Sequence, residues 1–359
     1  MTSMVATCPN RFVFKVISSF RRQRSASCLL ATALCLLLTA VCLLPTASAA
    51  SWTRQRSGTM AWLHAVHFIN HDHGWVAGSE GTLLETTDGG DTWTRVATLT
   101  KDTLRDVYFA DEHTGWLIAE RDVFKLRTND EARSYLMATE DGGLTWRQVF
   151  LEQLDVNARL VRASFADSQT GWVFGETGVV FATRDGGVSW TRQNLPTKRL
   201  LLGGTFIDDT RGWLVGAGST ILQTRDGGNT WQNGTVQDSR GTRFTGASFV
   251  GERLGWAVGS AGQVFATSDG GRIWFAQRTN VQNDLWDVKF ISALEGWAAG
   301  TNGTLLHTTD GGAHWFVEPS NVSHALERLF VIDRSHGWAV GFGGTILRLG
   351  QSAKPVLKS

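Results

Sequence analysis

Residues 74–93 read GWVAGSEGTLLETTDGGDTW, and the pattern of this stretch recurs along the chain. Its first dipeptide, Gly-Trp, occurs seven times, with the tryptophans at Trp75, Trp116, Trp172, Trp213, Trp256, Trp297 and Trp338. Successive copies lie 41, 56, 41, 43, 41 and 41 residues apart. A period near 41 residues, in repeats rich in β-forming residues and glycine turns, is typical of a β-propeller in which each repeat forms one blade.

A second marker, Asp-Gly-Gly-x-x-Trp, follows the Gly-Trp tryptophan by 13 residues in five of its six copies. The first repeat divides into four expected strands, 63–68, 74–78, 82–86 and 93–96, with the marker in the last turn. An aspartate there can accept hydrogen bonds from the backbone of its own turn, and the glycines supply positive φ. We interpret the six marker aspartates as structural clips, not catalytic acids: Asp88, Asp141, Asp185, Asp226, Asp269 and Asp310.

The two ends of the repeat region indicate how a ring of seven blades closes. The seventh repeat stops after three strands, whereas residues 51–54, Ser-Trp-Thr-Arg, match residues 92–95, Thr-Trp-Thr-Arg. We therefore expect an all-β, seven-bladed propeller over residues 51–350, with four antiparallel strands per blade and the N-terminal strand completing blade 7. Such closure removes free sheet edges. Fourteen of the 16 tryptophans then belong to the repeat, and only Trp62 and Trp286 do not.

Residues 1–50 have a different composition from the repeats. They hold all four cysteines and five basic residues but no acidic residue, and an apolar run at 28–44 precedes Ala-Ser-Ala-Ala at 47–50. This order predicts an export signal, with an uncleaved membrane anchor as the alternative. We expect the exported protein in a periplasm, a thylakoid lumen or outside the cell, with 351–359 as a C-terminal tail. The whole chain has 34 basic and 33 acidic residues; without the leader the net charge is −4, which argues against a nucleic-acid partner.

One face of the expected propeller collects basic residues. The connections that enter the first strand of each blade, and those between the second and third strands, share this face. Its predicted partner-binding residues are Arg105, Arg162, Lys198, Arg199, Arg243 and Arg328. Repetition at one level of a ring concentrates positive potential, although neighbouring acidic residues also fit an ordinary solvated surface.

The same face carries the main irregularity in repeat length. Repeat 2 has 12 extra residues between Trp116 and Asp141. They expand the hairpin between its second and third strands over 121–133, which includes Arg121, Lys125, Arg127 and Arg133. Insertions in repeat proteins often map to the binding face. We therefore expect this insertion to take part in binding, with a functionally neutral surface loop as the alternative.

The chain offers little for catalysis. Of a histidine group at His64, His67, His71 and His73, two lie on a strand and two in a turn on the opposite face, and no cysteine joins them, so we expect no metal site and no cofactor. The Asp-Gly-Gly turns resemble the Asp-box repeats of sialidases, but a sialidase needs a tyrosine nucleophile and an arginine triad, and only Tyr108 and Tyr135 exist. Separations across a propeller are invisible to a sequence, so a carboxylate pair such as Asp106 and Asp287 stays an open alternative.

The full repeat pattern, quoted above for residues 74–93, resembles the photosystem II stability/assembly factors of cyanobacteria and chloroplasts, and the resemblance spans about residues 51–350. It implies a monomeric, non-catalytic seven-bladed scaffold that holds a membrane-protein client during assembly, with an arginine patch as the binding surface. By resemblance the patch falls on Arg105, Arg162, Arg199 and Arg243. The chain departs from that family in lacking the lipoprotein cysteine of many cyanobacterial members and in its repeat 2 insertion. The alternative function is an exported carbohydrate-binding or glycoside-hydrolase-like Asp-box propeller.

Overall fold

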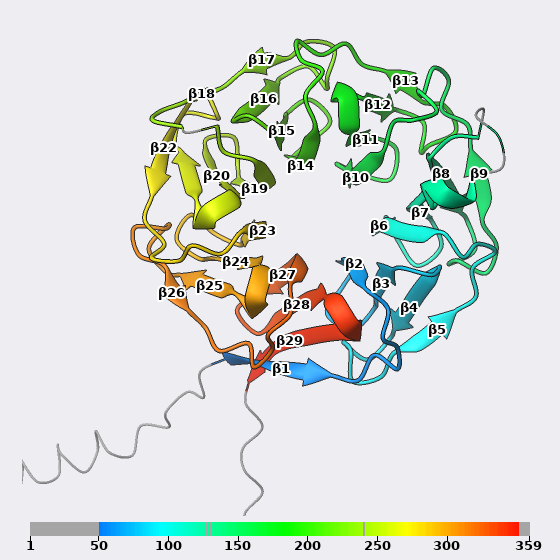
Figure 1. The fold of residues 1–359 in the computed structure, drawn as a ribbon, viewed down its shortest axis with the longest axis horizontal. Coiled ribbons are helices and arrows are strands. Elements are labelled where there is room, and N and C mark those ends of the chain that lie inside the picture. The colour runs from blue at the N-terminus through cyan, green and yellow to red at the C-terminus, as the bar shows by residue number, and fades with distance from the viewer. Residues whose placement is uncertain (1–49, 127, 129–130, 240, 352–359) are drawn as a thin grey trace, which may run out of the picture. The chain divides into compact units, whose positions relative to one another are not determined.

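The computed structural model describes residues 50–126, 128, 131–239 and 241–351. Within them, seven sheets are arranged radially around a common centre, which confirms the predicted seven-bladed propeller (Figure 1). Residues 1–49 of the expected leader, 352–359 of the expected tail and Arg127 of the insertion lie outside the described residues. The described part of the chain contains no helix with the length and apolar character that crossing a membrane requires.

Each blade runs from an inner first strand to an outer fourth strand, and these four strands pair antiparallel. Blades 1 and 2 consist of β2 (Leu63–Phe68), β3 (Gly74–Gly78), β4 (Thr82–Thr86) and β5 (Thr94–Val96), and of β6 (Thr103–Phe109), β7 (Gly115–Glu120), β8 (Ser134–Thr139) and β9 (Arg147–Val149). Blades 3 and 4 consist of β10 (Leu160–Phe165), β11 (Gly171–Gly175), β12 (Val180–Thr183) and β13 (Thr191–Arg192), and of β14 (Leu201–Phe206), β15 (Gly212–Gly216), β16 (Thr220–Thr224) and β17 (Gln232–Asn233).

Blades 5 and 6 follow the same plan with one addition. Blade 5 consists of β19 (Phe244–Val250), β20 (Leu254–Gly259), β21 (Val264–Thr267) and β22 (Ile273–Gln277), and β18 (Thr235–Val236) pairs parallel with β22 as a fifth strand. Blade 6 consists of β23 (Leu285–Phe290), β24 (Gly296–Gly300), β25 (Leu305–Thr308) and β26 (Phe316–Val317).

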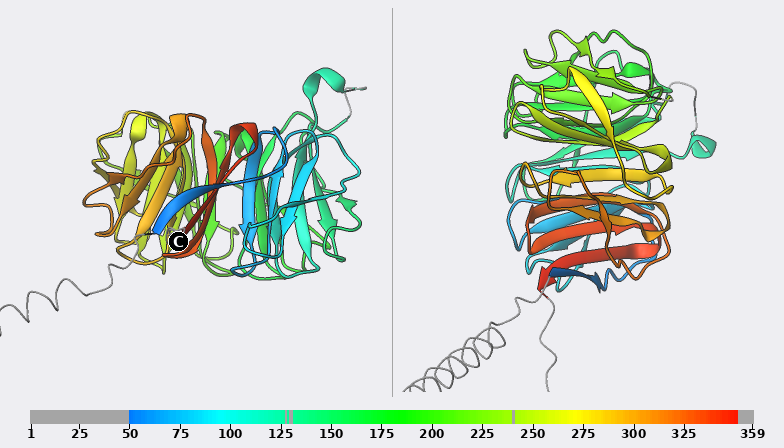
Figure 2. Two further views of the ribbon diagram at one scale, coloured as in Figure 1. Left: turned by 90° about the horizontal axis from the view of Figure 1, so that it is seen from below. Right: turned by 90° about the vertical axis from the view of Figure 1, so that its left-hand side faces the viewer.

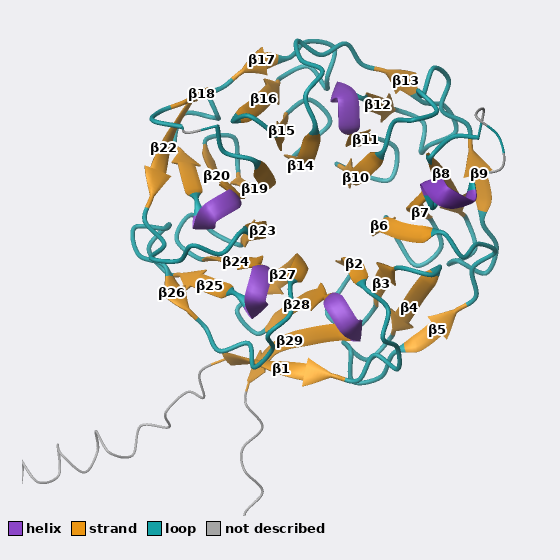
Figure 3. Cartoon of the chain, viewed as in Figure 1, coloured by secondary structure: helices purple, strands orange, loops and turns teal. Residues whose placement is uncertain are grey.

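Short 3-10 helices stand between the second and third strands of five blades, all toward the viewer in Figure 3. They are η1 (Val123–Lys125), η2 (Glu176–Gly178), η3 (Ser260–Gly262), η4 (Thr301–Gly303) and η5 (Phe342–Gly344). Figure 2 shows that η1, in the repeat 2 insertion, projects beyond the others from this face.

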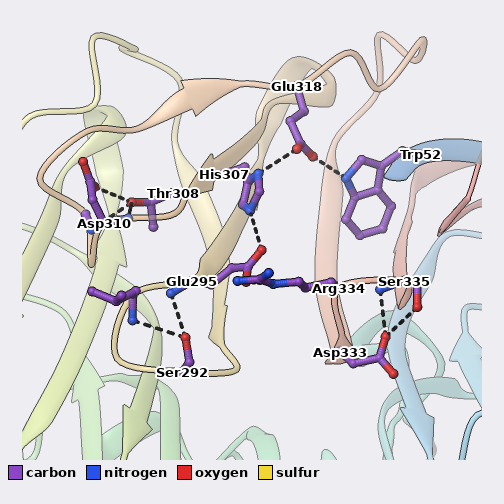
Figure 4. A network of polar contacts seen from close by, with 12 residues as sticks. Trp52, Ser292, Glu295, His307, Thr308, Asp310, Glu318, Asp333, Arg334 and Ser335 are labelled. Atoms are coloured by element: carbon purple, nitrogen blue, oxygen red, sulfur yellow. Dashed lines mark hydrogen bonds and ion pairs between the residues drawn. The ribbon is translucent and has the colours of Figure 1, made fainter. Parts of the chain in front are cut away.

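Blade 7 closes the ring as predicted. It consists of β27 (Leu326–Asp333), β28 (His336–Gly341) and β29 (Thr345–Gln351), with β1 (Ala50–Gln55) as its outer strand. β1 pairs antiparallel with β29, and Trp52 lies opposite Leu349. The Trp52 side chain is 4% exposed, and its Nε1 donates a 2.7 Å hydrogen bond to Glu318 Oε2 of blade 6 (Figure 4).

Aromatic side chains connect neighbouring blades. Phe206 of blade 4 stacks on Trp172 of blade 3 with 3.6 Å between ring centroids, and its edge contacts Trp231 of its own blade at 6.1 Å. The equivalent phenylalanines of blades 1, 2, 3, 5 and 6 make the same two contacts. The two tryptophans of each repeat therefore pack with these phenylalanines where neighbouring blades meet.

The Asp-Gly-Gly turns form the clips that the sequence predicts. In blade 1, Asp88 Oδ2 accepts a 2.6 Å hydrogen bond from the Thr92 hydroxyl, and its Oδ1 accepts bonds from the Thr92 backbone N–H and the Thr86 hydroxyl. The bonds from Thr92 stabilise the carboxylate and lower the pKa of Asp88 to about 2. Gly89 and Gly90 have φ of +70° and +93°, a region that favours glycine.

Candidate functional site

A bulge at the same position of every first strand shapes the centre of one face. In each blade the pairing of the first two strands skips one residue of the first strand. The skipped residue directly follows a buried leucine or phenylalanine: Leu63, Leu104, Leu160, Leu201, Phe244, Leu285 or Leu326. A bulge redirects a side chain that would otherwise follow the strand alternation. All seven skipped residues line one cavity of about 830 Å³: His64, Arg105, Val161, Leu202, Thr245, Trp286 and Glu327.

The basic residues predicted on this face divide between the cavity and its surroundings. Arg105, Arg162, Arg243 and Arg328 line the cavity, joined by Arg159, whereas Lys198 and Arg199 are not among the lining residues. The lining contains three carboxylates, Glu80, Asp284 and Glu327, against these five arginines. The cavity is therefore more basic than the domain as a whole.

Arg243 is the most available of these cations. Its side chain is exposed, and no ion pair of Arg243 occurs among residues 50–126, 128, 131–239 and 241–351. Arg105 and Arg159, in contrast, pair with Glu120 and Glu176. A cation without a carboxylate partner is the group that a ligand carboxylate binds at the smallest desolvation cost.

Two buried ion pairs join blades that are far apart in the sequence. Arg162 of blade 3 lies 3.2 Å from Asp287 of blade 6, and Arg328 of blade 7 lies 3.1 Å from Asp106 of blade 2. Asp106 Oδ2 also accepts a hydrogen bond from the Ala163 N–H. Burial raises the pKa of Asp106 to about 7, against the opposing effects of the Ala163 N–H and the Arg162 charge.

Asp106 and Asp287 are the carboxylates that were considered as a pair across the propeller. Asp287 Oδ2 accepts the Leu329 N–H, so it too has both a backbone and an arginine partner. The two carboxylates are thus 7% and 5% exposed and are held by groups of other blades. Their geometry is that of structural cross-links between blades.

Three aromatic side chains contact one another at the cavity. Trp62 and Trp286 stack with 6.5 Å between ring centroids, and Phe342 contacts Trp62 edge-on at 5.3 Å. All three line the cavity, and Trp62 and Phe342 are 36% and 46% exposed. No role was predicted for Trp62 and Trp286. The available signal was that these are the two tryptophans outside the repeat pattern.

The repeat 2 insertion is anchored beside the arginine side of the cavity. Buried Glu120 accepts hydrogen bonds from Arg105 and from Arg133, and Arg133 also pairs with Glu176 of blade 3 at 3.3 Å. Arg121 lies over the Tyr135 ring at 4.2 Å and donates to the Ala132 carbonyl. Of the four basic residues predicted in the insertion, Arg121 and Arg133 therefore serve its anchoring. Lys125 lies in η1, whose Phe124 is 94% exposed at the projecting tip.

The four histidines considered for a metal have separate partners. His64 Nδ1 lies 2.6 Å from Glu327, His67 Nε2 lies 2.8 Å from the Phe109 carbonyl, and His73 Nε2 lies 2.8 Å from Glu85. His71 lies 3.0 Å from Asp333 of blade 7. This group of four is not one site.

One family model matches most of the chain. A family model described as photosynthesis system II assembly factor YCF48 matches residues 44–131, 93–199, 189–285 and 272–348. A photosystem II assembly lipoprotein Ycf48 of Synechococcus sp. (strain CC9902) is 41% identical over 61 residues, which are 17% of this chain and 18% of that protein. The matched segment therefore spans less than a fifth of that relative.

Solved structures share the fold. A structure of YCF48 bound to D1 peptide superimposes with a TM-score of 0.69 at 20% identity, covering 86% of this chain and 99% of the other. A GH74 xyloglucanase from Xanthomonas campestris superimposes with a TM-score of 0.64 at 13% identity, covering 85% of this chain and 54% of the enzyme. At these identities the likeness concerns the propeller architecture alone.

Proposed function

Because the chain belongs to the photosynthesis system II assembly factor YCF48 family, we propose that it is a non-catalytic scaffold that holds a peptide segment of a protein client in the central cavity. The observation that carries the proposal is the composition of that cavity, in which arginines and aromatic rings converge. A YCF48 of the same fold binds D1 peptide, which supports a photosystem II protein as the client.

The cavity suits an extended acidic peptide with an apolar side chain. Arg243, which has no ion pair within the part of the chain that the structure describes, offers its guanidinium to a carboxylate. Charge-assisted hydrogen bonds of this kind are about twice as strong as neutral ones. Trp62 and Trp286 offer apolar ring surface beside it, and buried tryptophans and arginines commonly dominate binding energy. The peptide therefore gains binding energy both from the Arg243 guanidinium and from the rings of Trp62 and Trp286.

The rest of the basic face contributes more weakly. Arg105, Arg162 and Arg328 are committed to carboxylate partners and define the shape of the cavity. Lys198, Arg199 and the insertion residues Arg121 and Arg133 form the periphery, where charges steer an approaching client more than they hold it. The binding roles of Lys125 and Arg127 stay predictions.

Residues 1–50 fit this function as an export signal or a membrane anchor. Either would bring the propeller, residues 51–350, to a membrane-protein client, and we propose that the propeller acts as a monomer. The Synechococcus relative is a lipoprotein by name, so that protein is membrane-attached by a lipid. We propose the thylakoid lumen or an equivalent exported compartment, with the membrane contact made through the leader.

Fluorescence anisotropy of a labelled D1 peptide tests the proposal. We expect Arg243→Ala and Trp286→Ala each to weaken binding about tenfold, equivalent to about 1.4 kcal/mol. Lys198→Ala, which removes the same charge from the same face outside the cavity, should change affinity less than about twofold. Equal affinity of wild type, Arg243→Ala and Trp286→Ala would refute the assignment of the cavity.

Glycan binding is the second candidate function, because stacked tryptophans at a cavity also provide platforms for sugar rings. Xyloglucan is the natural test ligand, because a GH74 xyloglucanase has the same propeller architecture. Saturable binding of xyloglucan oligosaccharides that Trp62→Ala abolishes would favour this function. Release of reducing sugar would in addition contradict our proposal that the chain is not an enzyme.

A further inference from the structure

Three side chains from the two blades at the ring closure meet on the face opposite the cavity. His71 lies in the turn between β2 and β3 of blade 1, while Asp333 and His336 flank the turn between β27 and β28 of blade 7. Each offers a nitrogen or oxygen ligand atom, and these atoms all lie within 4.8 Å of one another. The sequence hides this group because His71 and Asp333 are 262 residues apart.

We propose that His71, Asp333 and His336 form a binding site for a divalent transition-metal ion of the zinc class, which ties blade 1 to blade 7. His71 Nε2 lies 3.0 Å from Asp333 Oδ2, and His336 Nδ1 lies 2.9 Å from the same oxygen. Ligand atoms around a tetrahedral zinc ion are roughly 3.3 Å apart, given bonds of about 2.0–2.1 Å. The two nitrogen–oxygen distances differ from that spacing by a few tenths of an ångström.

The carboxylate is already oriented for this role. Asp333 Oδ1 accepts hydrogen bonds from the Ser335 backbone N–H at 2.7 Å and from the Ser335 hydroxyl at 2.9 Å, as Figure 4 shows. Oδ2 is the oxygen that both imidazoles contact, and His336 Nδ1 also lies 2.9 Å from Oδ1 and 3.2 Å from the Ser335 hydroxyl. Outer partners of a ligand, such as Ser335 here, typically raise metal affinity. The nearby Arg334 pairs with Glu295 of blade 6, so Glu295 offsets its charge beside the site (Figure 4).

The donor set selects the class of ion. Two imidazole nitrogens with one carboxylate oxygen suit Zn²⁺, Ni²⁺ or Cu²⁺, whereas Mg²⁺ and Ca²⁺ prefer oxygen ligands throughout. Three protein ligands leave the fourth position of a zinc ion to water. The side chains of His71, Asp333 and His336 are 51%, 41% and 32% exposed, which gives an ion and that water access from solvent.

The position of the site predicts its effect. The seam between blades 7 and 1 already holds the stack of Phe68 on Trp338 and the hydrogen bond from Trp338 Nε1 to the Gly89 carbonyl. An ion bound there adds a link between two turns of the same seam. Because it binds the folded ring and not the separated turns, Zn²⁺ should raise the melting temperature in a concentration-dependent way.

The site is tested by isothermal titration calorimetry, in which Zn²⁺ is added to the full chain after its purification without a polyhistidine tag. We expect one Zn²⁺ per chain, affinity reduced more than about tenfold in His71→Asn and in His336→Asn, and no saturable binding of Mg²⁺. His314→Asn is the matched control, because His314 also contacts a carboxylate, Asp310 Oδ2 at 2.7 Å, but without a second histidine. Its affinity for Zn²⁺ should equal that of the wild type.

Absence of Zn²⁺ binding, or equal binding by His71→Asn and the wild type, would overturn the proposal and leave an ordinary hydrogen-bonded cluster. Circular dichroism shows whether the variants fold. Should they not, the visible absorption of Co²⁺ added to the wild type decides, because Co²⁺ held tetrahedrally by nitrogen and oxygen ligands has d–d bands much more intense than those of aqueous Co²⁺. A wild type that shows neither these bands nor a melting temperature raised by Zn²⁺ contradicts the site without any variant.

Discussion

Replacement of Trp52 tests whether the N-terminal strand is part of the folded ring. The Trp52 side chain is 4% exposed in a cluster with Trp297, Leu347 and Leu349, and its Nε1 donates to Glu318. Truncation of a buried tryptophan costs about 3–5 kcal/mol, so we expect Trp52→Ala to lower the free energy of unfolding by that amount. Equilibrium unfolding in urea measures the change.

Two further variants separate the contributions. Trp52→Phe keeps most of the ring but loses the N–H that Glu318 accepts, which should cost about 1–2 kcal/mol because Glu318 stays partly hydrated. Phe316→Ala, at a residue 63% exposed on the outer strand of blade 6, should cost less than about 0.5 kcal/mol. A cost below about 1 kcal/mol for Trp52→Ala, or one equal to that of Phe316→Ala, would refute the closure of the ring through β1.

Three other predictions concern the clips and seams. Hydrogen bonds lower the pKa of Asp141 from 3.8 to about 2, so their contribution to stability is present above pH 3.8 and is lost as the pH falls through 2. The difference in stability between wild type and Asp141→Asn should therefore shrink between pH 5 and pH 2, and a constant difference would contradict this. Burial disfavours protonated His307, but Glu318 and Glu295 outweigh burial and raise the pKa of His307 above 6.5. The contribution of His307 to stability is therefore full below pH 6.5 and is lost as the pH rises through the raised pKa. The melting-temperature gap between wild type and His307→Gln should be larger at pH 6 than at pH 9, and the reverse order would be evidence against the network in Figure 4. Gly187 has φ of +80°, and an added Cβ would lie 2.5 Å from Nε1 of Trp116 in the neighbouring blade. Gly187→Ala should therefore lower the free energy of unfolding in urea by about 1–3 kcal/mol. This is clearly more than we expect for Gly58→Ala, where an added Cβ has no heavy atom within 4 Å.

The features that sequence reasoning predicted are those that repeat. The positions of Gly-Trp and Asp-Gly-Gly specify where each strand and turn falls, because every blade solves the same packing problem with the same residues. The closure by β1 followed from a local match between residues 51–54 and 92–95, and the pairing of Trp52 with Leu349 confirms it. Strand ends differ by a residue or two, as with β5, which begins at Thr94 and not at Trp93.

The cavity was only partly predictable, because it depends on contacts that no repeat encodes. The bulge that redirects Trp286 and Arg105 depends on the pairing register, and the ion pairs of Arg162 with Asp287 and of Arg328 with Asp106 join residues 125 and 222 positions apart. Four of the six predicted basic residues line the cavity. The sequence could not show which of them already had partners.

A photo-cross-linking experiment tests the central claim, that the cavity binds the client peptide, most directly. A photoreactive benzoylphenylalanine replaces Phe342 at the cavity or, in a parallel protein, Phe316 on the outer rim, and each protein is irradiated with labelled D1 peptide. Both side chains are well exposed, at 46% and 63%, so accessibility does not favour the cavity. We predict a cross-link at position 342 that excess unlabelled peptide suppresses, and none at position 316. A cross-link at position 316 alone, or at neither position while the peptide binds, would contradict the account.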